Sequence, residues 1–213
     1  MTTQAGGAPV DIVNDLVDEL APKPAAGEKG STPFDENDAP SATELVAATP
    51  TMVYAAPRVV LVGMPGAGKS TIGRRIASAL NLPIVDSDLL IEEGEGKACG
   101  EVYAQLGEEG FRELEVGYVA RALATGGVVS LGGGAVVSEQ VRTLLQRHTV
   151  VWIDVTAEEG IRRTAEDASR PVLDGDDREQ RYRDLMEQRE PLYREVSLSL
   201  IHISEPTRLL SIS

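Results

Sequence analysis

Residues 63–71 combine glycines with a lysine and two hydroxyl side chains, in the sequence GMPGAGKST. Glycines at this spacing let successive backbone N–H groups turn toward one anion, and a following helix adds the positive end of its dipole. Lys69 can reach the β- and γ-phosphates of a nucleotide, and the Ser70 hydroxyl can ligate Mg²⁺. An apolar strand-like run, 58–62, precedes the loop, and a helical pattern follows it. We therefore predict that the chain binds a nucleoside triphosphate.

A pair of carboxylates, Asp86 and Asp88, follows a second short apolar run at 84–86. Side chains two residues apart point in similar directions while the backbone stays extended. Opposite a phosphate-binding loop, one carboxylate can hold Mg²⁺ through water and the other can accept a proton from a hydroxyl group. We therefore expect both acids to face the nucleotide.

Three further groups could contribute to a site. Gly132, Gly133 and Gly134 follow a third apolar run and permit either a sharp turn or a close approach of a ligand to bare backbone. Arg112 lies among carboxylates, where it can form a surface ion pair or hold a substrate carboxylate through two hydrogen bonds. Arg170 opens an Asp-rich loop that we interpret as a mobile lid, from which it can reach transferring phosphates.

The elements that must position these groups alternate between strand and helix. Strand patterns cover 58–62, 84–86, 128–131 and 149–154, and helical patterns cover 70–80, 88–124 with a break at 94–96, 138–147, 157–168 and 178–190. Such alternation predicts an α/β fold of three layers, with a central parallel sheet covered by helices on both faces. Ligands of such folds bind at the carboxyl ends of the strands, where each group above is placed.

Composition limits the classes of partner. The net charge of −14 argues against nucleic-acid binding, and no apolar run is long enough to span a membrane. Residues 1–56 carry nine acidic side chains and two lysines in a segment rich in Ala, Pro, Gly, Ser and Thr, so we expect a disordered acidic extension. The N-terminus lacks the pattern of a signal peptide and the single cysteine fits a reducing compartment, so we expect a cytoplasmic protein.

Over residues 57–196 the order of these motifs resembles shikimate kinase. The shared features are the phosphate-binding loop, Asp86-Ser87-Asp88, Ile91-Glu92, Gly107-Glu108-x-x-Phe111-Arg112-x-x-Glu115, Leu131 with the glycine triplet, Arg170-Pro171 and Arg189-Glu190-Pro191-Leu192-Tyr193. The resemblance implies a P-loop kinase fold like that of nucleoside-monophosphate kinases, with five parallel strands and a monomeric state. It implies transfer of the γ-phosphoryl group of ATP to the 3-hydroxyl of shikimate, with Mg²⁺ as cofactor.

The resemblance also implies roles for individual residues. Asp88 would hold the ring hydroxyls and act as the base, Arg112 and Arg189 would clamp the substrate carboxylate, and Gly132, Gly133 and Gly134 would offer N–H groups to the same ligand. Lys69 and Arg170 would stabilise the transferred charge. Ser70 would ligate Mg²⁺ directly, and Asp86 would do so through water. The implied ATP contacts are Gly66, Ala67, Gly68, Lys69, Ser70, Thr71, Arg163 against the adenine, and Arg170.

Two other functions compete with this interpretation. Another small-molecule kinase of the same fold, such as a gluconate kinase, would share the phosphate-binding loop but lack Phe111-Arg112 together with Arg189 in this order. A nucleotide-binding module without catalysis would need to have lost an acid or the lid arginine, yet Asp86, Asp88 and Arg170 are all present.

The C-terminal segment, 197–213, departs from the family pattern. Residues 198–208 match an in-frame translation of a transposase adapter used in sequencing libraries, so we interpret the segment as a non-native tail. Its alternating apolar pattern would nevertheless fit the edge of a sheet, and we expect 197–203 to occupy the place of the fifth strand. We also expect weaker ATP binding, because the family's adenine loop and last helix would be absent.

Overall fold

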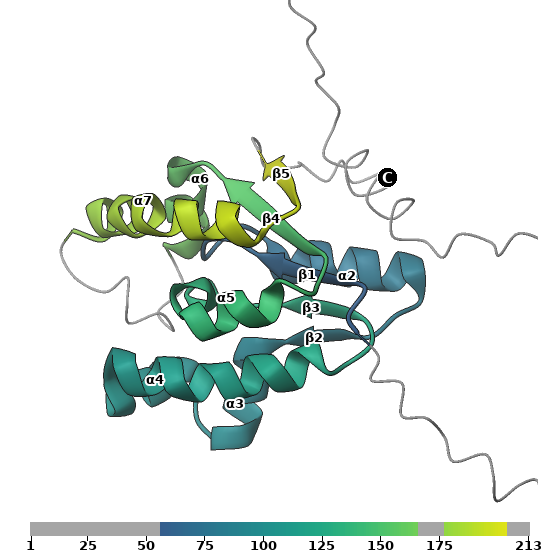
Figure 1. Cartoon of the computed structure of the whole chain (residues 1–213). Helices are drawn as coiled ribbons and strands as arrows, with labels where there is room; N and C mark the ends of the chain where they lie inside the picture. Colours follow the sequence, from purple (N-terminus) through teal and green to yellow (C-terminus); the bar gives the residue numbers. More distant parts are fainter. Residues whose placement is uncertain (1–55, 166–176, 204–213) are drawn as a thin grey trace, which may run out of the picture.

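A five-stranded parallel sheet forms the centre of the computed structural model, which describes residues 56–165 and 177–203 (Figure 1). The strands lie in the order β2-β3-β1-β4-β5, and every neighbouring pair is parallel. Their bounds are Val59–Val62 (β1), Ile84–Asp86 (β2), Val128–Ser130 (β3), Val150–Val155 (β4) and Ser199–Ile203 (β5). The predicted central parallel sheet is confirmed.

Helices cover both faces of this sheet, which gives three layers (Figure 1). Helix α2 lies on one face, and α4, α5 and α7 lie on the other. The helical bounds are Lys69–Leu80 (α2), Ser87–Glu95 (α3), Cys99–Leu123 (α4), Glu139–Leu145 (α5), Ala157–Thr164 (α6) and Arg178–Val196 (α7), with a 3₁₀ turn at Ala135–Val137 (η1). The predicted three-layer α/β class is therefore confirmed.

The central strands explain why the core forms here. All four residues of β1 are buried, and their partners on β3 and β4 are also apolar at most positions. Strands with both faces covered by helices carry such continuous apolar runs rather than alternating ones. This arrangement fixes the carboxyl ends of β1, β2 and β3 side by side, at the edge where the phosphate-binding loop, Asp86 and the glycine triplet follow.

Helix α7 continues past the predicted end at residue 190. It includes Pro191 and ends at Val196. Proline in a helix removes one backbone hydrogen bond and clashes with the preceding turn. For this reason the sequence predicts that the helix ends before Pro191. Arg189 and Tyr193 on either side of Pro191 both contact the loop after β3, and this tertiary anchoring stabilises the helix across the proline.

The expected strand at 197–203 is present as β5, paired with β4 at the edge of the sheet. The backbone N–H of Leu198 also donates to the Val150 carbonyl at 3.0 Å. Ile201 is buried, whereas Leu198 and Leu200 are 78% and 52% exposed. A strand thus forms because its backbone pairs with β4, although Leu200 within it faces solvent. The adapter origin of residues 197–213 stays a prediction.

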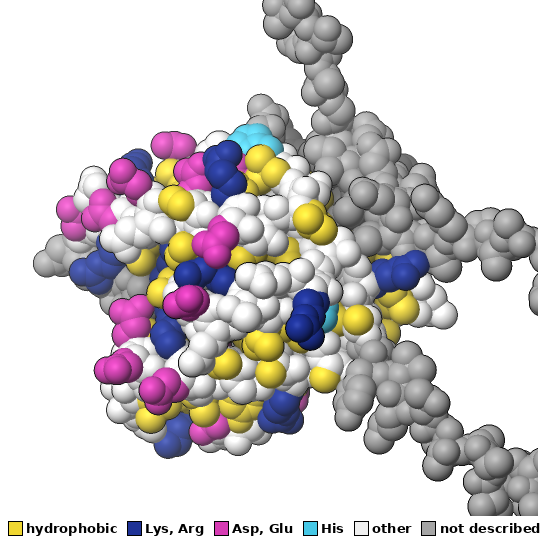
Figure 2. All heavy atoms as spheres, viewed as in Figure 1, with side chains coloured by type: hydrophobic (Ala, Val, Ile, Leu, Met, Phe, Trp, Pro, Cys, Tyr) yellow, Lys and Arg dark blue, Asp and Glu magenta, His cyan; other side chains and the backbone are white. Residues whose placement is uncertain are grey.

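Charged side chains of both signs are distributed over the visible surface. Acidic and basic side chains are interspersed on the face shown in Figure 2, which carries no continuous basic patch. Within the described ranges, none of the helices is long and apolar enough to cross a membrane. The predicted acidic extension at 1–56 lies almost entirely outside those ranges.

Candidate active site

The phosphate-binding loop connects β1 to α2 in a conformation that depends on glycine. Gly68 precedes the first residue of α2 with φ 91° and ψ 16°, a left-handed conformation that favours glycine. A side chain at Gly63 would overlap the Ile153 carbonyl of β4. Lys69 lies almost buried behind the loop, and its Nζ donates to the carbonyls of Gly63 at 2.9 Å and Met64 at 3.1 Å. The loop is therefore closed around the lysine that is expected to meet the phosphates.

Ser70 and Asp86 meet at the start of α2. The Ser70 hydroxyl donates to Asp86 Oδ2 at 2.8 Å, although the residues belong to different elements of the fold. Asp86 is the last residue of β2 and also caps α3, because its Oδ1 accepts from the Asp88 backbone N–H at 3.1 Å. A hydroxyl and a carboxylate in contact beside a phosphate loop supply the oxygen ligands that Mg²⁺ prefers. The donor set thus fits the predicted metal site.

Asp86 and Asp88 do not share the extended backbone on which similar side-chain directions depend. The chain turns into α3 at Ser87, so the extended backbone that this geometry requires ends at Asp86. Asp86 turns toward Ser70, whereas Asp88 approaches Gly132 so closely that a side chain there would overlap its Oδ1. The two carboxylates therefore serve different parts of the site.

The glycine triplet brings the predicted substrate residues together. A side chain at Gly132 would overlap Asp88, and one at Gly134 would overlap the Arg112 guanidinium. The carbonyl of Gly133 accepts from Arg189 Nη1 at 3.2 Å. None of the three glycines has a positive φ, although the chain turns here, with the Ala135 N–H donating to the Gly132 carbonyl at 3.1 Å. Atoms of neighbouring residues approach all three closely. One short loop thus contacts an acid and two arginines from α3, α4 and α7.

Arg112 is held by a buried carboxylate. Its Nη1 lies 2.8 Å from Glu115 Oε2 one turn along α4, and Glu115 is only 1% exposed. Burial raises the pKa of Glu115, while the positive charges of Arg112 and Arg189 oppose that rise. Within the described residues, Nε of Arg112 and Nε of Arg189 are buried polar atoms without a hydrogen-bond partner. Both guanidinium groups therefore retain donors for a further anion.

Arg189 and Tyr193 fix the glycine loop from α7. The Tyr193 hydroxyl donates to the Gly133 carbonyl at 2.5 Å, beside the bond from Arg189. Burial raises the pKa of Tyr193 to about 12, so the hydroxyl remains a donor at neutral pH.

Cys99 lies near Asp88, and its Sγ donates to the Asp88 carbonyl at 3.3 Å. Burial, and then the charge of Asp88, raise the pKa of its thiol to about 12. It is therefore a packing residue rather than a nucleophile.

Arg163 of α6 reaches the phosphate-binding loop. Its Nη1 donates to the Gly66 carbonyl at 3.2 Å, and its Nε donates to Glu159 Oε1 at 2.6 Å. Hydrogen bonds from Arg162, and then from Arg163, lower the pKa of Glu159 to about 2, so this carboxylate stays ionised and holds Arg163 in place. Arg170, the predicted lid residue, lies outside the described residues.

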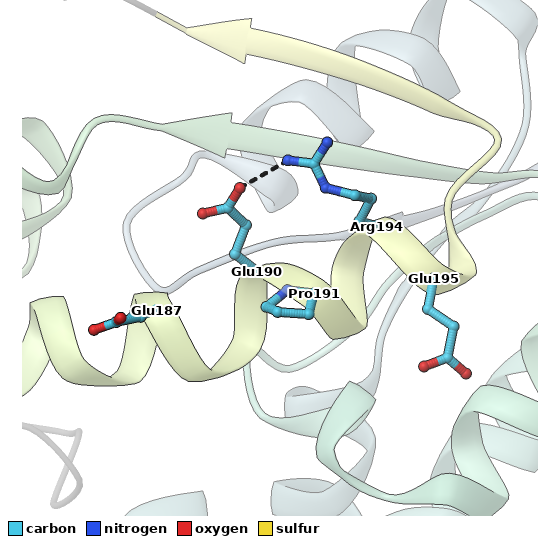
Figure 3. Close-up of a pocket in the computed structure, with 5 residues that line it drawn as sticks. All are labelled: Glu187, Glu190, Pro191, Arg194 and Glu195. Carbon is cyan, nitrogen blue, oxygen red and sulfur yellow. Dashed lines mark hydrogen bonds and ion pairs between the residues drawn. The ribbon is translucent and has the colours of Figure 1, made fainter.

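A separate pocket of about 500 Å³ lies on α7, lined by Glu187, Glu190, Pro191, Arg194 and Glu195 (Figure 3). Arg194 points toward Glu190, and the two side chains form an ion pair at 2.8 Å. Arg189 and Tyr193 of the same helix instead contact Gly133. None of the predicted site residues lines this pocket, so it is not the place where they meet.

Sequence reasoning assigned no role to several residues that support the site. The ion pair between Glu115 and Arg112 is predictable from their i,i+3 spacing, which places both side chains on one face of a helix. Ser87, whose hydroxyl accepts from the Gly132 N–H at 2.9 Å, gave no signal beyond its place between two acids. The contacts of Tyr182 and Tyr193 join residues 117 and 60 positions apart and have no local sequence pattern.

Fold and site together define a P-loop phosphotransferase, in which the phosphate-binding loop lies beside a glycine triplet that contacts Arg112 and Arg189. A family model described as "Shikimate kinase" matches residues 65–210. The chain is 64% identical to the shikimate kinase of Corynebacterium efficiens over 143 residues, which cover 67% of this chain and 85% of that protein. It is 62% identical to the shikimate kinase of Corynebacterium glutamicum over 141 residues, covering 66% and 83%.

Solved structures give the same result. A shikimate kinase from Acinetobacter baumannii in complex with shikimate aligns with a TM-score of 0.68 at 36% identity, covering 71% of this chain and 86% of that one. A shikimate kinase from Bacteroides thetaiotaomicron aligns with a TM-score of 0.64 at 31% identity, covering 69% and 86%. The chain belongs to the shikimate kinase family. The family resemblance, the fold class and the enzyme class predicted from the sequence are therefore confirmed.

Proposed function

We propose that this chain transfers the γ-phosphoryl group of ATP to the 3-hydroxyl of shikimate, giving shikimate 3-phosphate and ADP. The observation that carries the proposal is the glycine triplet, which contacts Asp88, Arg112 and Arg189 and also touches the phosphate-binding loop. A Cβ at Gly133 would lie only 2.8 Å from Pro65 Cδ. Acceptor and nucleotide sites therefore adjoin, as an in-line transfer between two bound substrates requires.

On the acceptor side, two cations and one acid match the chemistry of shikimate. The guanidinium groups of Arg112 and Arg189 can hold a carboxylate through charge-assisted hydrogen bonds. Asp88 on α3 can bind ring hydroxyls and accept the proton of the hydroxyl that attacks phosphorus. Because Gly132 and Gly134 have no side chains, Asp88 and Arg112 can both approach the same loop. Positioning and proton acceptance thus come from this chain's own side chains.

On the nucleotide side, the backbone of residues 66–71 and the Lys69 ammonium bind the phosphates of ATP. Ser70 and Asp86 would hold Mg²⁺, Ser70 directly and Asp86 through water, because their oxygens already meet at 2.8 Å. When bound, the ion would neutralise charge on the phosphate oxygens. Arg163 would contact the adenine, and Arg170 would approach the transferred group from the lid. The monomeric state and the cytoplasmic location remain proposals, the first of them implied by the family resemblance, with shikimate and ATP as the partners.

A coupled assay of ADP release tests the reaction. Rates are measured with ATP and Mg²⁺ in three parallel samples that contain shikimate, gluconate or no acceptor. We expect ADP release that depends on shikimate, with formation of shikimate 3-phosphate in equal amount. Release that depends on gluconate would support the rival kinase, and nucleotide binding without ADP release under any condition would indicate a non-catalytic module.

Asp86→Asn is expected to raise the Mg²⁺ concentration needed for half-maximal rate about tenfold, because residues that position a metal typically change its affinity by about that factor or more. Asn can still cap α3, so the fold should be retained. Mg²⁺ is titrated at fixed ATP and shikimate, with Asp184→Asn, an exposed carboxylate of α7, as the charge-matched control. An unchanged Mg²⁺ requirement in Asp86→Asn would exclude Asp86 from the metal site.

A further inference from the structure

Helix α7 reaches the phosphate-binding loop through a buried tyrosine. Tyr182 is fully buried, and its hydroxyl donates to the Pro65 carbonyl at 2.8 Å. Pro65 lies inside the loop, one residue before Gly66. A hydroxyl with this degree of burial makes a directional contact that water cannot easily replace. The contact is therefore a candidate for fixing the shape of the loop.

The packing around the Tyr182 hydroxyl depends on a glycine in α6. A side chain at Gly160 of α6 would overlap Tyr182 Oη. A side chain at Gly66 would lie 3.0 Å from both the Gly160 carbonyl and Thr164 Cγ2. Tyr182 thus passes α6 at the one residue without a side chain and meets the loop where α6 also packs against it.

Peptide geometry links these contacts to ligand binding. The carbonyl of one residue and the N–H of the next share a planar trans peptide and point in opposite directions. Holding the Pro65 carbonyl therefore fixes the direction of the Gly66 N–H, which points away from Tyr182. The bond from Arg163 holds the next carbonyl, that of Gly66, and the Ala67 N–H donates within the loop to the Met64 carbonyl at 3.2 Å. The Gly66 N–H is thus the amide of the phosphate-binding loop whose direction the Tyr182 contact controls.

Tyr193 makes the matching contact on the acceptor side. Its hydroxyl donates to the Gly133 carbonyl at 2.5 Å, which in the same way fixes the direction of the Gly134 N–H. Both tyrosines belong to α7 and both hydroxyls are bound to a loop carbonyl. Because Pro65 and Gly133 also pack against each other, the two loops and the helix form one connected unit.

We propose that Tyr182 is a positioning residue for the nucleotide: by holding the Pro65 carbonyl, its hydroxyl sets the orientation of the Gly66 N–H in the phosphate-binding loop. Tyr193 sets the glycine triplet for the acceptor in the same manner. The division of roles rests on the proposed function, which assigns the two loops to ATP and shikimate. Each hydroxyl donates to a loop carbonyl, so each tyrosine acts through a loop peptide.

Tyr182→Phe and Tyr193→Phe test the division, because each removes one hydroxyl and keeps the buried ring. Kd values for a non-hydrolysable ATP analogue with Mg²⁺, and for shikimate, are measured by calorimetry on both variants of the full chain. We expect Tyr182→Phe to weaken the analogue about fivefold and shikimate less than about twofold, the range of one lost hydrogen bond. Tyr193→Phe should show the reverse pattern.

Gly160→Ala provides a second route to the same defect, because its added methyl group displaces the Tyr182 hydroxyl while the tyrosine remains. It should weaken the ATP analogue as Tyr182→Phe does. A lower Tm with both Kd values unchanged, or equal weakening of both ligands in both tyrosine variants, would overturn the proposal. The same measurements separate this proposal from the proposed function. If the wild-type chain binds the ATP analogue but not shikimate, the proposed reaction is contradicted. The effect of Tyr182→Phe on the Kd of the analogue then still tests the role of Tyr182.

Discussion

Replacing Asp88 with Asn is expected to lower kcat with shikimate by about 10²- to 10⁴-fold, the usual contribution of a positioned general base. Asn has nearly the same shape and fits beside Gly132, where the backbone leaves no room for a larger change. It cannot accept the proton of the attacking hydroxyl. The Kd of an ATP analogue should change by less than about twofold, because Asp88 lies against Gly132 in the glycine triplet, the loop proposed to bind the acceptor.

Two comparisons make this result specific to Asp88. Glu93→Gln removes an exposed carboxylate from the same helix and should leave kcat unchanged. The Mg²⁺ requirement should stay constant in Asp88→Asn but rise in Asp86→Asn, since Asp86 accepts a hydrogen bond from Ser70. If Asp88→Asn keeps kcat within about tenfold of the wild type, the base must be another group.

Much of this site could be predicted from the sequence because topology places strand ends together. The order of strands and helices required a parallel sheet, and parallel strands present their carboxyl ends at one edge. The phosphate-binding loop, Asp86 and the glycine triplet each follow such a strand, so their proximity follows from the topology. The contact between Ser70 and Asp86 is the direct consequence, and the structure has it at 2.8 Å.

What the sequence could not supply depends on tertiary contacts and on where a helix begins. Asp86 and Asp88 diverge because α3 starts between them, a boundary that local patterns locate only to within a few residues. Helix α7 passes through Pro191 because Arg189 and Tyr193 are anchored on Gly133, and no local propensity records that anchor. The support of both loops by Tyr182 and Tyr193 was missed for the same reason.

Arg112→Ala is expected to raise the KM for shikimate about 30-fold or more, since a charge-assisted hydrogen bond to a buried partner typically contributes about 2–3 kcal/mol. Arg112 lies beside Gly134 in the loop proposed to bind the acceptor, so the Kd of the ATP analogue should stay within about twofold. Steady-state kinetics with varied shikimate and calorimetry with the analogue provide the two values. Equal losses for both substrates would contradict the assignment of Arg112 to the carboxylate.

Stability gives an independent check, because Arg112→Ala also leaves Glu115 without its ion-pair partner. Burial already raises the pKa of Glu115 above its ordinary value of 4.5, and loss of Arg112 removes an influence that lowers it. An acid whose folded-state pKa is raised favours folding below the unfolded-state pKa, and this contribution is lost as pH rises through the folded-state value. The unfolding free energy of Arg112→Ala should therefore fall as pH rises from about 4.5 toward neutrality.

The double variant Arg112→Ala/Glu115→Gln carries no ionisable carboxyl group at position 115. It should therefore lose this pH dependence and recover stability at pH 7, yet retain the raised KM for shikimate. Recovery of the KM as well would mean that Arg112 acts only as the partner of Glu115 and does not bind the substrate.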